Sequence, residues 1–313
     1  MADTGKIKLS LSLLAAMGLG MPTGAVARQW EEENTPTKRY TSSIITRGSN
    51  KTGDSKSEER YQRQLEQIES NRETLSQRYK TAKTKDRKLL LAESREYITE
   101  QMLETILPAR LDIGWILGKE AVTVGDRKYI TNCHQRKNPY SNQTNSLEDD
   151  ICTNCSLYVA DVLLDAGFRF TRGGKTGIGG QLAVDIIRTF SEKREISWFN
   201  TTSNLEESLN HLVTQVKSKE PGMYIVGLDR HVGFLVYGQP LDSSRKKREK
   251  EVYFCHAAYY ENYLQVMCEK ADTSGILYHS RIKVIGRILG NSMMESWLNR
   301  KQIPTIISPT NRN

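Results

Sequence analysis

The fold is decided by residues 223–237, which read MYIVGLDRHVGFLVY. β-Branched and aromatic side chains fill the two runs 223–228 and 231–237, and runs of this kind predict strands. Three further runs follow, at 252–258, 264–268 and 283–288. Because these strands come consecutively in the chain, they predict an antiparallel sheet.

Helices are expected before the strands. Residues 155–167 predict one amphipathic helix that ends at Gly167. Its apolar side chains gather on one side: Leu157, Tyr158, Val162, Leu163 and Ala166. Residues 181–190 and 204–217 predict two more helices. Helices followed by consecutive strands define an α+β domain.

The N-terminus has the features of a secretory signal peptide. Lys6 and Lys8 precede an apolar stretch at 9–21, and Ala25-Val26-Ala27 offers a small-x-small cleavage site. This pattern predicts a signal over residues 1–27 and an exported protein, periplasmic or secreted. The apolar stretch is too short to span a bilayer, and no other stretch approaches ~20 apolar residues. A buried N-terminal helix is the alternative interpretation.

A polar segment and a charged helical arm follow the signal. Residues 28–56 hold few large apolar side chains, which predicts a flexible linker. Residues 57–108 repeat apolar side chains at helical spacing, and Pro108 is expected to close that run. The charged stretch 80–88 interrupts the stripe, so the arm is expected to pack on the main domain rather than form a coiled coil. The signal, linker, arm, main domain and tail are thus expected at residues 1–27, 28–56, 57–108, 109–300 and 301–313.

The net charge does not choose a partner by itself. A formal charge of +8 and a pI of about 9.1 suit an anionic surface. An exported protein beside anionic envelope polymers meets that environment without nucleic acid, which is not expected as a partner. Residues 243–251, SSRKKREKE, predict a solvated charged loop between two strands, with contact to a polyanion as the alternative.

The chain contains five cysteines, Cys133, Cys152, Cys155, Cys255 and Cys268. An odd number in an exported protein indicates a partner on another chain or a free thiol. Cys255 and Cys268 flank two predicted strands and could pair, and Cys133 and Cys152 bound one loop and could also pair. That arrangement would leave Cys155 free, although spacing alone does not fix the connectivity.

Cys155 stands where a loop gives way to the amphipathic helix. The unsatisfied N–H groups and the positive dipole end of a helix N-terminus favour thiolate over thiol. The same N–H groups can hold the oxyanion that forms when a carbonyl is attacked. The position therefore predicts an activated nucleophile, with a structural or disulfide-bonded cysteine as the alternative.

Two histidines are expected near one another on adjacent strands. Strand alternation places His231 and Gly233 on the same face, where the missing side chain of Gly233 leaves space for a helix or a substrate. A hairpin would bring His256 beside His231. There His256 could orient the imidazole of His231, as the third member of a catalytic triad does.

The order of these motifs resembles the NlpC-type cell-wall peptidases, which are papain-like in fold. The matching segments are CSLYV at 155–159, HVGF at 231–234 and HA at 256–257. The resemblance covers roughly residues 110–290. It implies a papain-like domain in which helices pack on an antiparallel sheet, with cysteine peptidase or amidase activity on a cell-wall peptide.

Residue roles follow from that resemblance. Cys155 would be the nucleophile, His231 its base and His256 the orienting residue, with no metal or cofactor. Tyr140, Ser156 and Gly233 are the candidate oxyanion or substrate contacts. The family usually carries an acidic residue before the nucleophile, where this chain has Asn154. Cysteine before histidine in the chain favours amide hydrolysis over the acyl transfer of permuted relatives.

Two other functions remain open from the sequence. Cys152 and Cys155 have CxxC spacing and Cys133-His134 lies upstream, so these four residues could bind zinc in a structural or binding module. The chain could also be an inactive scaffold that binds cell-wall peptide without cutting it.

Overall fold

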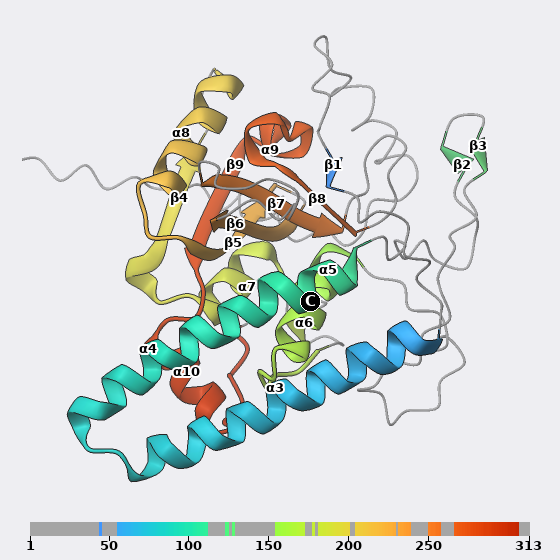
Figure 1. Ribbon diagram of the computed structural model, residues 1–313. Coiled ribbons are helices and arrows are strands. Elements are labelled where there is room, and N and C mark those ends of the chain that lie inside the picture. The colour runs from blue at the N-terminus through green and yellow to red at the C-terminus, as the bar shows by residue number, and fades with distance from the viewer. Residues whose placement is uncertain are drawn as a thin grey trace, which may run out of the picture.

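The computed structural model shows an α+β protein (Figure 1). It describes residues 55–111, 154–172, 177–178, 181–200, 204–229, 231–238, 250–257 and 266–306, together with the two-residue strands β1 (Ile44–Ile45), β2 (Thr123–Val124) and β3 (Arg127–Lys128). The predicted signal peptide, most of the linker and nearly all of the charged loop lie outside the described residues.

One antiparallel sheet forms the centre of the protein. Its strands are β4 (Ile196–Asn200), β5 (Gly222–Leu228), β6 (Val232–Gly238), β7 (Glu251–Ala257), β8 (Val266–Lys270) and β9 (Ile282–Arg287), in the order β1-β8-β7-β6-β5-β9-β4. Every neighbouring pair is antiparallel. The five predicted strands are therefore confirmed, while β4 adds a strand at the edge beside β9 that the sequence did not indicate.

Helices cover both faces of this sheet (Figure 1). Helices α6 (Cys155–Asp165) and α7 (Ala183–Phe190) pack on one face, and α8 (Leu205–Lys217) and α9 (Gly275–His279) lie over the other. Alternation along β6 follows this division, because Val232 and Phe234 join the core under α6 whereas Leu235 joins the core under α8. The three predicted helices are confirmed. Helix α6 ends at Asp165, two residues before the predicted end, and Gly167 follows the C-cap residue Ala166 with a φ of 86°, which suits glycine.

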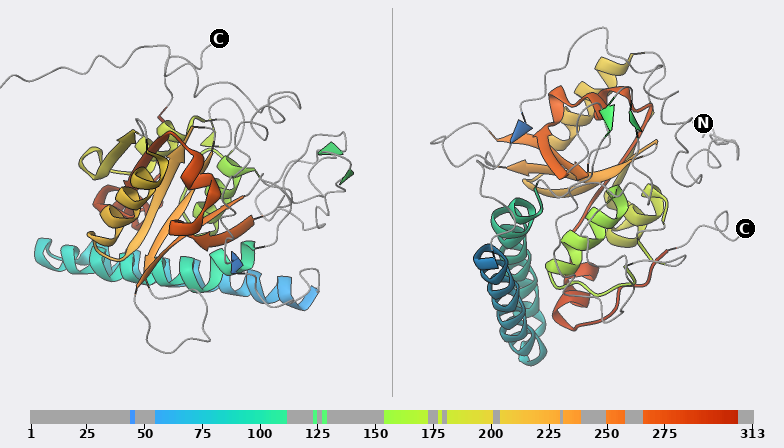
Figure 2. Two further views of the ribbon diagram at one scale, coloured as in Figure 1. Left: turned by 90° about the horizontal axis from the view of Figure 1, so that it is seen from above. Right: turned by 90° about the vertical axis from the view of Figure 1, so that its right-hand side faces the viewer.

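A long helical hairpin lies on the outer side of α6. Helix α3 (Ser55–Thr81) turns into α4 (Thr84–Gln101), and a π-helical turn (Met102–Ile106) leads into α5 (Leu107–Arg110). The helix thus runs past Pro108, contrary to expectation, because Pro108 occupies the first turn of α5, where proline is tolerated. Figure 2 shows the hairpin beside α6 and α10 (Asn291–Leu298).

The hairpin shares one hydrophobic core with the main domain. Ile68 of α3 and Ile98 of α4 are buried together with Trp297 of α10. The indole N–H of Trp297 donates to the Ala166 carbonyl at 2.7 Å, and Arg72 donates to the Trp297 carbonyl at 3.2 Å. Helix α10 therefore connects the hairpin to the C-terminal end of α6.

A buried ion cluster connects the hairpin to α6 directly. Asp165 accepts hydrogen bonds from Tyr61 of α3 and from Arg110 of α5, whose Nε lies 2.8 Å away. One turn earlier on α6, Asp161 accepts from Arg172 Nε at 2.6 Å and lies 3.6 Å from the Arg110 guanidinium. Two carboxylates and two guanidinium groups therefore balance each other's charge along one side of α6.

A disulfide joins β7 to β8. Cys255 and Cys268 are direct partners in the register of these strands and form the bond that the sequence allowed. Cys155 is a free thiol, while Cys133 and Cys152 lie outside the described residues. No helix in the described parts of the chain is long and apolar enough to cross a membrane.

Replacing Asp165 with alanine should lower the free energy of unfolding by about 3–5 kcal/mol, because Arg110 would keep its charge in the core without its main partner. Glu93→Ala is the matched control, since its pair with Arg78 is about half exposed. That change should cost less than about 1 kcal/mol. Urea titration of both variants gives the comparison, and equal losses would contradict the role assigned to the buried cluster.

Candidate active site

The first turn of α6 is capped by Asn154. Its side-chain oxygen accepts from the Leu157 N–H at 2.8 Å and from the Ser156 hydroxyl at 3.0 Å. Asparagine caps a helix about as well as aspartate does, so this position needs no acid to start the helix. The cap makes Cys155 the first residue of α6.

The thiol of Cys155 meets the beginning of β6. Burial raises the pKa of this thiol to about 11, although the backbone N–H groups of Val232, Ser156 and Cys155 itself act to lower it. The residue keeps part of its surface exposed, yet the loss of hydration outweighs the N–H groups. The N–H groups at the helix N-terminus thus act in the expected direction, but burial outweighs them and the thiol is protonated near pH 7.

His231 immediately precedes Val232 and contacts His256. The Nε2 of His231 lies 3.0 Å from the Nδ1 of His256, and the two rings are almost perpendicular. The hairpin between β6 and β7 was predicted to bring these two histidines together, and this contact confirms that prediction. Burial, and then the neighbouring His256, hold the pKa of His231 well below its usual value of 6.5. His231 is therefore neutral at pH 7.

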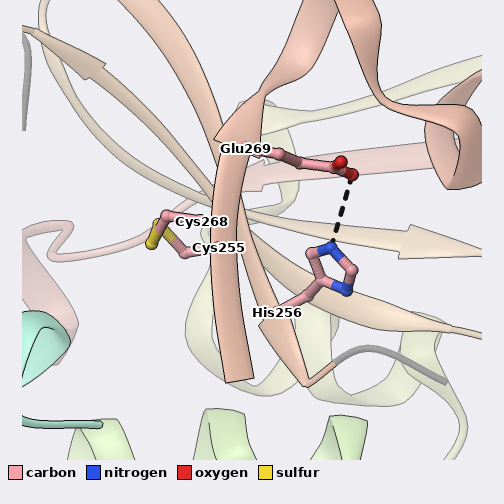
Figure 3. Close-up of a disulfide and its surroundings, with 4 residues drawn as sticks. All are labelled: Cys255, His256, Cys268 and Glu269. Atoms are coloured by element: carbon pink, nitrogen blue, oxygen red, sulfur yellow. Dashed lines mark ion pairs between the residues drawn. A yellow bond between two sulfur atoms is a disulfide. The ribbon is translucent and has the colours of Figure 1, made fainter. Parts of the chain in front are cut away.

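His256 is held between the two strands that flank β7. It is fully buried, and its ring stacks on Phe254 with centroids 4.2 Å apart. On the side away from His231, its Nε2 lies 3.4 Å from the Oε1 of Glu269 on β8 (Figure 3). This is an ion-pair distance without the alignment of a standard hydrogen bond.

Glu269 was not predicted as a site residue. It follows Cys268 on β8 and is 4% exposed. The Ser274 hydroxyl donates to the Oε1 of Glu269. The predicted strand 264–268 stopped one residue short of Glu269, whereas β8 includes it. The only sequence signal was a glutamate directly after that strand candidate, and an acidic side chain is expected to have a partner once it is buried.

Gly233 is needed for a reason that differs from the expected one. A Cβ at this position would stand 2.7 Å from the Phe254 ring and 2.8 Å from both the Cys255 carbonyl oxygen and the His256 Cβ. The space beside Gly233 is therefore filled by β7 and its side chains, rather than by a helix or a substrate. Gly233 lets His256 and Phe254 pack against β6.

The other predicted site residues have different positions. The Ser156 hydroxyl is engaged with Asn154, so the backbone N–H of Ser156 is its contribution at the sulfur. Tyr140 lies outside the described residues, as do Cys133, His134 and Cys152 of the alternative zinc site. Among the residues that the structure does describe, no group of three or more histidine, cysteine, aspartate or glutamate side chains could hold a metal ion.

No family model matches the chain, and neither a curated protein nor a solved structure matches it. The NlpC-type resemblance therefore stays a prediction. Any role proposed for Cys155, His231 and His256 has to be argued from their geometry in this chain.

Gly233→Ala should destabilise the protein by about 1–3 kcal/mol, because the added methyl group overlaps backbone and two side chains. Gly238→Ala, on the same strand, is the matched control, since a Cβ there has nothing within 4 Å. That variant should unfold within about 1 kcal/mol of the wild type. Denaturant titration measures both, and an undisturbed Gly233→Ala protein would contradict the packing described here.

Alkylation of Cys155 by iodoacetamide should accelerate with pH and reach no plateau below about pH 10, because a thiol with a pKa of about 11 gains thiolate continuously over that range. Peptide mass spectrometry locates the label on Cys155. Urea-unfolded protein is the control and should level off near the ordinary thiol pKa of about 8.5. A plateau below pH 8 in the folded protein would instead indicate a preformed thiolate–imidazolium pair.

Proposed function

We propose that this protein is a cysteine hydrolase that cleaves an amide bond, with Cys155 as nucleophile, His231 as base and His256 as the residue that orients His231. One observation carries the proposal. The thiol at the start of α6 faces the N–H of Val232, the residue directly after His231, and His231 is itself held by His256 at 3.0 Å.

The reaction would begin with both the Cys155 thiol and the His231 imidazole uncharged. Cys155 is protonated and His231 is neutral near pH 7, so the thiol proton moves to His231 as the sulfur attacks the amide carbonyl carbon. The tetrahedral intermediate then expels the amine, which takes that proton from His231. Water attacks the resulting thioester with His231 again accepting a proton. The Cys155 sulfur then leaves and takes that proton back from His231, as the acyl group is released as a carboxylic acid.

The backbone N–H groups around the sulfur would assist the first step. Cys155 and Ser156 supply theirs from the unsatisfied first turn of α6, and Val232 supplies one from β6. An oxyanion formed next to the sulfur lies within the same set of donors. Such donors act most strongly on charge that develops in the transition state, so they can favour attack even though they do not ionise the resting thiol.

The cell wall is the proposed source of the substrate. The motif order resembles that of cell-wall peptidases. A helix that presents a cysteine to an antiparallel sheet, with a histidine directly before β6, is compatible with a papain-like domain. The signal-like residues 1–27 support export to the periplasm or the medium. A net charge of +8 suits work beside anionic envelope polymers.

p-Nitrophenyl acetate tests the chemistry without knowledge of the natural substrate. The wild type should release p-nitrophenolate in a burst of one equivalent and carry an acetyl group on Cys155, seen by peptide mass spectrometry. Cys155→Ala and His231→Ala should each lower this rate by a factor on the order of 10³ or more. His256→Ala should cost less, because His256 acts through His231.

His211→Ala is the control, because His211 is an exposed histidine on α8 and should leave the rate unchanged. Digestion of purified peptidoglycan, followed by chromatography of the released peptides, then tests the substrate class. A wild type that is never acylated at Cys155 would refute the hydrolase. Acylation without peptidoglycan cleavage would refute only the cell-wall substrate.

A further inference from the structure

A row of polar side chains crosses three strands on one face of the sheet. His231 at the start of β6 contacts His256 on β7, and His256 contacts Glu269 on β8. The register pairs His256 with Met267, so Glu269 is its diagonal neighbour two residues further along β8. Diagonal neighbours in antiparallel strands are within reach of long side chains.

At the Glu269 end of this row, the direction of the hydrogen bond between Ser274 and Glu269 is fixed. The Ser274 oxygen accepts from the Leu277 N–H at 3.2 Å, as the cap of α9, and its hydroxyl hydrogen is directed at Glu269. Glu269 is thus an acceptor for Ser274. A carboxylate has only acceptor atoms, so the His256 nitrogen that faces it is best satisfied by carrying a hydrogen.

We propose that Glu269 is a positioning residue that sets the tautomers of both histidines. With the hydrogen on its Nε2, facing Glu269, the neutral ring of His256 has a lone pair on Nδ1. That lone pair accepts from the Nε2–H of His231. His231 then has its lone pair on Nδ1, the nitrogen that would accept the Cys155 proton in the proposed reaction. This role rests on the proposed hydrolase.

Glu269 also supplies charge where the proposed reaction needs it. When His231 takes the thiol proton, a positive charge forms in a buried pair of imidazoles. A carboxylate 3.4 Å from His256 offsets that charge, and at 4% exposure little water screens it. The carboxylate would therefore favour the protonated histidine pair during attack, in addition to choosing the resting tautomer.

The surrounding structure holds His256 and Glu269 in register. Cys255 and Cys268, the residues immediately before them, form the disulfide between β7 and β8 (Figure 3). The disulfide projects to one side of the two strands, and the His256–Glu269 pair lies on the other. Phe254 stacks on the His256 ring. A covalent bond and a stacked ring thus limit how far the two groups can separate.

Imidazole ¹⁵N chemical shifts test the proposal in the full chain labelled at histidine. In the wild type, His256 should carry its hydrogen on Nε2 and His231 on Nε2. Ser274 and the Nε2 of His256 both contact the Oε1 of Glu269, so Glu269→Gln can keep an oxygen there and removes only the charge. Glu269→Leu removes the acceptor. In Glu269→Leu, His256 should carry its hydrogen on Nδ1 in a substantial share of molecules, and His231 should then carry its hydrogen on Nδ1 as well.

The rate of Cys155 acetylation by p-nitrophenyl acetate should fall about 10- to 100-fold in Glu269→Gln. This is the range usual when the residue that orients a functional histidine is replaced. Its pH profile should shift to lower pH, because His231 would bind a proton less tightly without the carboxylate. Glu251→Gln is the matched control. Glu251 lies on β7 and pairs with Lys270 at 2.5 Å, at a partly exposed site away from His256.

Unchanged tautomers in Glu269→Leu, together with an unchanged rate in Glu269→Gln, would overturn the proposal. If either variant does not fold, the wild-type spectrum still decides, because a hydrogen on the Nδ1 of His256 contradicts the assigned role. A wild type without acetylation refutes the hydrolase, and the ¹⁵N shifts then decide separately whether Glu269 orients the two histidines.

Discussion

The structure around the candidate site depends on the close approach of β7 to Gly233 on β6. With no side chain at this position, the Phe254 ring and the His256 Cβ can occupy the space that a Cβ would need. His256 then reaches His231, and its ring can lie flat on Phe254. A register slip of one residue would turn His256 to the opposite face of the sheet. One small residue and one strand register therefore determine whether two distant histidines meet.

Cys155, the proposed nucleophile, is placed by a separate set of interactions. Asn154 caps the start of α6, and Trp297 binds the Ala166 carbonyl at its end. Along its side, Asp165 is held by Tyr61 and Arg110. The helical hairpin and α5, which continues it, thus belong to the framework that positions Cys155, since they supply Tyr61 and Arg110. Shifts of about an ångström in a reacting group can cost a large part of a rate, which gives a physical reason to fix both ends and one side of the helix.

The parts that the sequence predicted well are those governed by local pattern. Alternation and β-branched runs gave the strands from 223–228 onward, the amphipathic stretch 155–167 gave α6, and the hairpin gave the contact between His231 and His256. Edge strand β4 and helix α10 were missed.

The features of the site that the sequence did not predict depend on burial against parts of the chain that are distant in sequence. A helix N-terminus favours a thiolate, but the sheet packed over Cys155 disfavours it more strongly, and a sequence pattern does not report that packing. Glu269 was missed for the same reason, because its partners lie on β7 and beside α9.

Burial is also the reason why the proposed mechanism needs the row of polar side chains His231, His256 and Glu269. The low-dielectric surroundings that keep Cys155 protonated and His231 neutral also strengthen every charge interaction that forms during attack. A separated thiolate and imidazolium would be costly at rest, whereas the same two charges are stabilised when backbone N–H groups face the sulfur and Glu269 lies behind His256. An arrangement of this kind favours the transition state more than the resting state, which is the condition for catalysis rather than for tight binding.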